Sequence, residues 1–186
     1  TPGKPPEQQT GNIRDFVYKR TAQGDLKLRV YLPEGWTSQD RRPAIVFFFN
    51  SRWTGGSVEQ FRPQARYFAQ RGMVAALADY RVRGRHGTTG EKCVEDARSA
   101  VRWLRENTGT LGVDPDRIVA AGDSIGACIA VCTSFLDESD AQGEDASISC
   151  RANLLILIDP VLDYESVTSP FATAEAARRV SPRLHL

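Results

Sequence analysis

The sequence predicts an α/β protein with a mostly parallel sheet, an N-terminal antiparallel hairpin and helices on both faces of the sheet. The main observation is a set of short, continuous apolar runs, which are typical of parallel strands covered on both faces; they span 44–49, 74–78, 118–121 and 154–158. Between them, apolar residues recur with helical period over 58–70 and 91–107. Buried strands that alternate with helices favour right-handed crossovers, which place helices on both sides of one sheet.

The segment before these runs follows a different pattern. Residues 16–19 and 26–32 alternate apolar and polar side chains on either side of Gln23-Gly-Asp25, which predicts an antiparallel hairpin with one solvated face. Residues 1–11 contain three prolines and few apolar side chains, so we expect a disordered lead-in before one domain over 12–186.

Length and charge exclude several classes of protein. The 186 residues are enough to bury a core, and a formal net charge of +1 gives no overall field that would favour nucleic acid or an anionic membrane. No apolar run reaches the length of a membrane span. The arginines of 81–85 form the nearest approach to a cluster, which we interpret as a solvated loop, with contact to an anionic substrate as the alternative.

The four cysteines, Cys93, Cys128, Cys132 and Cys150, match neither a zinc ribbon nor a Cys-x-x-Cys redox site, and no metal or nucleotide motif stands out, so no cofactor is expected. We interpret them as small buried apolar residues. The chain begins at Thr1 rather than Met, which suggests either processing or an artificial start of the sequence. A secreted or periplasmic location is suspected, while the compartment stays open. In an exported protein, a disulfide that involves Cys93 or Cys150 is the alternative.

The most informative motif is Gly-x-Ser-x-Gly around Ser124. An apolar strand precedes it and a helix of small residues follows, which is the context of a nucleophile elbow. Gly122 and Gly126 would allow the sharp turn and the close packing that this elbow requires. The pattern predicts that Ser124 is a nucleophile at the start of the helix; the alternative is an ordinary strand-turn-helix connection.

Together with this elbow, several other segments give the chain a family resemblance. It resembles the α/β-hydrolase fold, and within it the esterases and lipases related to hormone-sensitive lipase. The resemblance runs from about Ile13 to Ser181 and rests on an ordered set of segments besides the elbow: 42–49, 53–57, 72–81 and 114–118. It implies acyl transfer, in which the serine attacks an ester carbonyl, a histidine moves the proton and an acid orients the histidine.

The loop after the third strand departs from that family. Relatives carry a glycine-rich His-Gly-Gly-Gly-Trp or Phe-Gly-Gly-Gly-Trp, whereas this chain has Phe49-Asn-Ser-Arg-Trp53. Glycines let two amides converge on an oxyanion with no side chain in the way. We therefore expect the backbone amides of Ile125, Ser51 and Arg52 as oxyanion donors, with three Cβ atoms crowding the turn and the Arg52 side chain free to fill the acyl pocket or bind an anion.

The second departure concerns the rest of the triad. The resemblance implies that the acid and the histidine follow two further strands, which are missing from this chain. The sequence has two histidines: His86 is interpreted as a loop residue or a substitute base, and His185 is too near the end of the chain to be a good base. Asp159 and Asp163 follow the last apolar run and are candidate substitute acids, although Asp159 before Pro160 could equally cap a turn.

A strand at Leu154–Ile158 would then lie at an edge of the sheet with unpaired amides and an apolar flank. Exposed edges of this kind pair with something. We expect a chain truncated before its C-terminal strands, or one that covers the edge by forming a homo-oligomer or with its residues 169–186.

The activity that this resemblance implies is hydrolysis of a small carboxylic ester by Ser124, with a carbohydrate-linked acyl group as one candidate. As given, the chain would be weak or inactive because loss of a triad member costs several orders of magnitude in rate. The alternative is a noncatalytic α/β-hydrolase-like binding protein with a degraded oxyanion loop.

Overall fold

The computed structural model describes residues 13–136, 140–164 and 171–185, so the predicted lead-in over 1–11 lies outside the described residues. Within these ranges one six-stranded sheet has the order β1-β2-β4-β3-β5-β6. Its strands are β1 (Ile13–Thr21), β2 (Gly24–Tyr31), β3 (Arg42–Phe48), β4 (Val74–Ala78), β5 (Val113–Asp123) and β6 (Leu154–Ile158). The β1–β2 and β2–β4 pairs are antiparallel and the other three are parallel, which confirms the predicted mixed sheet.

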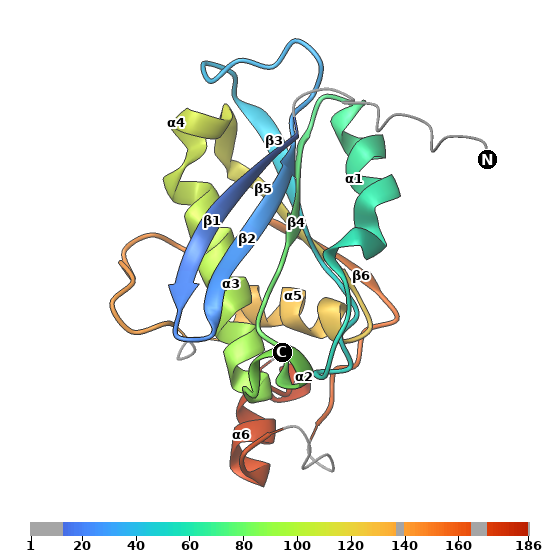
Figure 1. Cartoon of the computed structure of the whole chain (residues 1–186), viewed down its shortest axis with the longest axis vertical. Helices are drawn as coiled ribbons and strands as arrows, with labels where there is room; N and C mark the ends of the chain where they lie inside the picture. Colours follow the sequence, from blue (N-terminus) through green and yellow to red (C-terminus); the bar gives the residue numbers. More distant parts are fainter. Residues whose placement is uncertain (1–12, 137–139, 165–170, 186) are drawn as a thin grey trace, which may run out of the picture.

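Helices cover both faces of the sheet, as predicted (Figure 1). They are η1 (Val58–Phe61), α1 (Arg62–Ala69), α2 (Arg83–His86), α3 (Gly90–Glu106), α4 (Thr108–Leu111), α5 (Ile125–Phe135), α6 (Ala174–Arg179) and η2 (Pro182–Leu184). Along β3, Ile45 and Phe47 pack in the core with Phe61 and Ala65 on the α1 side. Val46 and Phe48 belong to the core on the α3 and α5 side. Both faces of β3 are buried, which is why its sequence has no alternating polar positions.

Two predicted elements have different boundaries in the structure. The helix expected over 58–70 is divided into η1 and α1, because Pro63 fits the first turn of an α-helix and has no N–H to continue the one before. The strand expected over 118–121 begins earlier, at Val113, and its register against β3 shifts between Val113 and Ile118. Within this irregularity, Asp114 Oδ1 accepts a hydrogen bond from the Asp116 amide at 3.1 Å.

The interpretation of 81–85 as a solvated loop is wrong for Arg81, which is only 6% exposed. Its guanidinium contacts Asp96 on α3 with Nη2 2.7 Å from Oδ1 and Nε 2.8 Å from Oδ2. Lys19 on β1 reaches the same carboxylate at 2.8 Å, and Glu95 pairs with both cations. This buried ion cluster fixes the end of β4 against α3, and the residues after Arg81 turn into the short helix α2.

The edge strand β6 pairs with β5 alone among the described residues, and much of its apolar surface is open. Leu154 is 54% exposed and Ile158 is 48% exposed. The expectation that residues 169–186 cover this edge is wrong for their described part, because α6 contacts α3 and η2 contacts α5. Figure 1 shows β6 at the border of the sheet, with α6 below it.

The four cysteines are free thiols and all are buried, in line with the apolar interpretation and without the alternative disulfide. No described helix combines the length and the apolar character needed to cross a membrane.

Candidate active site

Ser124 lies on a strained turn between β5 and α5. Its φ of 53° and ψ of −111° place a non-glycine residue in a sparsely populated region of backbone space, which residues at functional turns adopt at an energetic cost. Its amide donates to the Ile158 carbonyl at 2.9 Å, and its carbonyl accepts from the Cys128 amide at 3.0 Å. The residue is partly exposed, and its hydroxyl makes no hydrogen bond within the described residues.

The two glycines of the motif are required by close backbone contacts. A Cβ at Gly122 would lie 2.2 Å from the Gly126 carbonyl group, and a Cβ at Gly126 would lie 2.0 Å from the Phe48 carbonyl oxygen. The elbow therefore packs directly against the end of β3, from which the candidate oxyanion loop departs.

That loop is a compact turn with two non-glycine residues at positive φ, Arg52 at 48° and Trp53 at 64°. The Ser51 carbonyl accepts from the amides of Thr54 and Gly55, both at 2.9 Å, and Ser51 Oγ accepts from the Trp53 amide at 3.0 Å. The serine thus supplies local hydrogen bonds that hold the turn where relatives of this fold use glycine.

The three amides expected as oxyanion donors differ in their surroundings. Within the described residues, those of Ser51 and Ile125 donate no hydrogen bond, although both residues are buried. The Arg52 amide is directed at Asn50 Oδ1, 3.3 Å away. An oxyanion site requires amides of this kind, whose hydrogen is not already donated to another group.

Both ends of the loop are fixed. On the Trp53 side, the indole packs edge-on against Tyr164 and Phe171, with ring centroids 5.4 and 5.0 Å away. The Trp53 carbonyl also accepts from the Arg83 amide of α2 at 2.9 Å. This use of α2 and of the C-terminal segment is a tertiary feature that the sequence did not indicate.

Tyr80 supports the other end; it lies in the segment 72–81 of the family resemblance but was not predicted as a site residue. Its hydroxyl donates to the Phe49 carbonyl at 2.5 Å, and the two rings stack with centroids 4.2 Å apart. Burial raises the pKa of Tyr80 well above its usual range, so the phenol stays neutral and remains a donor.

Three of the candidate acids and bases have contacts within their own segments or at the surface. His86 Nδ1 lies 3.0 Å from the Val82 amide at the start of its own helix, so the ring acts as a local cap. Asp163 pairs with Arg183 at 3.0 Å. The exposed residue His185 follows η2 at the end of the described chain.

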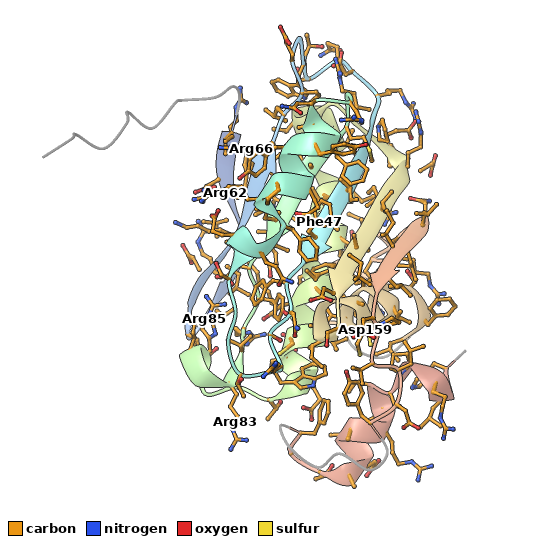
Figure 2. All side chains as sticks on the ribbon, turned by 90° about the vertical axis from the view of Figure 1, so that its right-hand side faces the viewer. Phe47, Arg62, Arg66, Arg83, Arg85 and Asp159 are labelled. Atoms are coloured by element: carbon orange, nitrogen blue, oxygen red, sulfur yellow. The ribbon has the colours of Figure 1, made fainter. Side chains whose placement is uncertain are left out.

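Asp159 is the one candidate acid beside the elbow. It directly follows Ile158, the hydrogen-bond partner of the Ser124 amide, and has a positive φ of 44° (Figure 2). Its carboxylate is exposed and makes no hydrogen bond or ion pair within the described residues. No cluster of three or more metal-binding side chains is present in the same residues.

Comparison with known proteins agrees with this geometry. The BD-FAE family model matches residues 28–178. The chain belongs to the BD-FAE family. Among solved structures, it is similar to esterase 2 of Thermogutta terrifontis phosphorylated by paraoxon, with 45% identity and a TM-score of 0.89, covering 99% of this chain and 69% of that one.

Curated relatives of this BD-FAE family member are also esterases. Carboxylesterase NlhH of Mycobacterium tuberculosis is 34% identical over 113 residues, which cover 60% of this chain and 34% of the relative. A probable isoprenylcysteine alpha-carbonyl methylesterase of Oryza sativa, ICMEL1, is 34% identical over 159 residues, covering 78% of this chain and 36% of the relative. The chain therefore spans about a third of the length of these curated relatives. The predicted family and the α/β-hydrolase fold are confirmed.

Proposed function

We propose that the protein is a serine hydrolase of carboxylic esters, with Ser124 as the nucleophile. The single observation that carries this proposal is the backbone of Ser124, which is strained at φ 53° and packed against the end of β3 by two glycines that tolerate no side chain. The family and the esterase relatives support the same activity.

In this proposal Ser124 Oγ attacks the ester carbonyl, and the negative charge that forms on its oxygen is stabilised by backbone amides. The amides of Ser51 and Ile125 belong to buried residues and have no acceptor within the described residues, so they can donate without first breaking another bond. The Arg52 amide can add a third hydrogen bond only by leaving Asn50 Oδ1. The tetrahedral intermediate then collapses, the alcohol leaves with the proton taken from Ser124, and an acyl-enzyme remains. Water hydrolyses this acyl-enzyme, the carboxylic acid leaves, and Ser124 recovers a proton.

We further propose that a histidine and an acid outside residues 1–186 complete the triad, in a segment that pairs with the open edge of β6. Two observations support this arrangement: the exposed apolar side chains of β6 and the local or surface contacts of His86 and Asp163. A second copy of this chain on the same edge is the competing arrangement.

The substrate in this proposal is a small acyl ester. Esterase 2 of T. terrifontis is also known with propionate bound, at 45% identity to this chain and a TM-score of 0.85. The crowded turn at Asn50–Arg52 supports a short acyl group, since side chains there leave less space than glycines would.

The test is covalent labelling of the full-length protein with a fluorophosphonate, together with hydrolysis of p-nitrophenyl acetate. Wild type should be labelled at Ser124 and Ser124→Ala should lose both labelling and hydrolysis, whereas the exposed control Ser38→Ala should keep them. Labelling that survives Ser124→Ala would refute the nucleophile. A folded wild type that neither labels nor hydrolyses esters would favour the noncatalytic binding protein.

A further inference from the structure

The side chain of Gln60 joins the nucleophile elbow to the candidate oxyanion loop. Its Nε2 donates to Asp123 Oδ2 at 3.0 Å, and its Oε1 accepts from the Asn50 amide at 2.7 Å. Asp123 directly precedes Ser124, and Asn50 directly precedes Ser51. One primary amide therefore connects the two parts of the site through residues that are 63 and 10 positions away from it in sequence.

The chemistry of the two partners fixes the orientation of this amide. A carboxylate only accepts hydrogen bonds and a backbone N–H only donates, so the group between them must donate on one side and accept on the other. A carboxamide does both, whereas glutamate would repel Asp123. Because both bonds lie at the exposed surface, a hydrocarbon at position 60 would leave the two partners to water and would no longer join them to each other.

The backbone around Gln60 is fixed by its own contacts, so the side chain starts from a defined position beside its two partners. Ser57 caps η1 by accepting from the Glu59 amide at 3.2 Å, and the buried ring of Phe61 stacks on Phe47 with centroids 5.0 Å apart. At Gly56, with φ of 140°, a Cβ would lie 2.5 Å from the Phe49 ring and 2.7 Å from the Asn50 carbonyl oxygen. The segment that delivers Gln60 therefore passes directly over the start of the oxyanion loop.

We propose that Gln60 is a positioning residue, which keeps the turn at Asn50–Arg52 in register with Ser124. This inference rests on the proposed esterase function. Asn50 links Gln60 to the turn: the Asn50 amide donates to Gln60, and the Asn50 side chain accepts from the Arg52 amide at 3.3 Å. A rotation of Asn50 would turn the neighbouring Ser51 amide away from the developing oxyanion, and a misplacement of about 1 Å in a catalytic group can cost about 100-fold in rate.

The experiment compares four variants of the full-length protein: Gln60→Ala, Gln60→Glu, Asp123→Asn and the double variant Gln60→Glu with Asp123→Asn. Gln60→Ala should lower kcat for p-nitrophenyl acetate about tenfold with little change in KM, because the lost interaction acts on the transition state. The kcat of Gln60→Glu should be lowered at least as much as that of Gln60→Ala, because two carboxylates then face each other.

The double variant distinguishes the proposed bridge from a general loss of activity at position 60. The asparagine introduced at position 123 can donate through its amide nitrogen to the glutamate introduced at position 60, and that glutamate still accepts from the Asn50 amide. The donor-acceptor pattern is thereby restored, so kcat should return to within about threefold of wild type. Asp123→Asn alone keeps an oxygen that accepts from Gln60 and serves as the second single variant of the double-mutant cycle. The matched control is Gln64→Ala, an exposed glutamine on α1 that should leave kcat unchanged.

Hydrogen exchange of the Asn50 amide gives a readout that does not depend on activity. Protection of this amide should fall in Gln60→Ala and recover in the double variant. Unchanged protection in Gln60→Ala, or a double variant no better than Gln60→Glu, would overturn the inference while leaving the esterase function intact. If wild type shows neither hydrolysis nor labelling at Ser124, the proposed function and the catalytic role of Gln60 fail together, and the exchange data still establish or refute the bridge itself.

Discussion

The amide of Ser124 donates a hydrogen bond to the carbonyl of Ile158 at 2.9 Å, so the nucleophile elbow is attached to the end of the edge strand. On its other side the elbow is packed through Gly126 against the carbonyl of Phe48. The strained residue is thus held between two parallel strands, β3 and β6. Strain of this kind persists only where the surrounding structure determines it from several directions.

The elbow glycines should not tolerate alanine. Gly126→Ala places a Cβ 2.0 Å from a backbone oxygen, which cannot move without displacing β3. We expect a loss of about 3 kcal/mol in the free energy of unfolding, the upper part of the range for overpacked sites, measured by urea denaturation. Gly109→Ala is the matched control because nothing lies within 4 Å of its Cβ. Equal stability of the two variants would mean that the contact at Gly126 is wrong.

Replacing Asp96 should be strongly destabilising. Its carboxylate is fully buried and pairs with Arg81 and Lys19, and removing one partner of a buried ion cluster leaves uncompensated charge. Asp96→Ala should lower the free energy of unfolding by about 3–5 kcal/mol, measured by chemical denaturation. Arg41→Gln, which breaks the exposed pair with Asp114, should leave the denaturation midpoint unchanged. A small effect at Asp96 would show that water reaches the cluster.

Stability should fall in acid because several carboxyls have depressed pKa values in the folded protein, among them the partly buried Glu95 and Asp140. For Glu95, burial raises the pKa but hydrogen bonds from Lys92 and Lys19 outweigh it; for Asp140, burial is outweighed by Arg98 and Arg102. The unfolded chain then binds more protons, so the stabilisation is complete above the ordinary values of 4.5 and 3.8 and is lost as pH falls through the lower folded values.

Urea unfolding between pH 7 and pH 3 measures this dependence. The free energy of unfolding should decrease as the pH falls below about 4.5. In Asp140→Asn, this decrease of the free energy with pH should be smaller. A free energy that stays constant down to pH 3 would contradict the assigned ion pairs.

Arg52→Gly should stabilise the protein. Arg52 has a φ of 48°, a left-handed conformation that costs a residue with a Cβ about 1 kcal/mol and costs glycine almost nothing. We expect a gain of about 0.5–1 kcal/mol by thermal or chemical denaturation. Arg52→Ala is the matched control, because it removes the side chain but keeps the Cβ, and it should give no gain. Equal gains would assign the effect to the guanidinium rather than to the backbone.

Residues 1–186 expressed alone should self-associate through β6. Ile156 and Ile158 project from an edge strand and are 37% and 48% exposed, which is typical of strands that pair with another chain. Sedimentation at micromolar concentration should show species larger than 20.6 kDa, and Ile156→Lys should shift them to the monomer. Tyr67→Lys, at an exposed position on α1, serves as the control. A monomer in every case would show that this edge is protected in another way.

The sequence alone determined the elements whose signals are local. The apolar runs predicted β3, β4, β5 and β6, because a parallel strand buried on both faces has no polar alternation. The elbow at Ser124 could be predicted because its glycines and its serine lie within five consecutive residues. The loop over 50–52 could likewise be located from the strand before it and Trp53 after it.

Only the tertiary structure decided the contacts between distant segments. The sequence predicts that Arg81 is solvated because it belongs to a run of arginines, but the fold places it in the interior with Asp96 of α3 and Lys19 of β1. No sequence pattern predicts a role for Gln60, whose partners Asn50 and Asp123 become its neighbours only in the assembled sheet. The partners of Arg81 and Gln60 lie far away in sequence, and the type of a residue does not determine which distant residues it will contact. Local propensity fixes where strands and turns form, whereas the side chains that support a site depend on which strand ends become neighbours once the sheet has assembled.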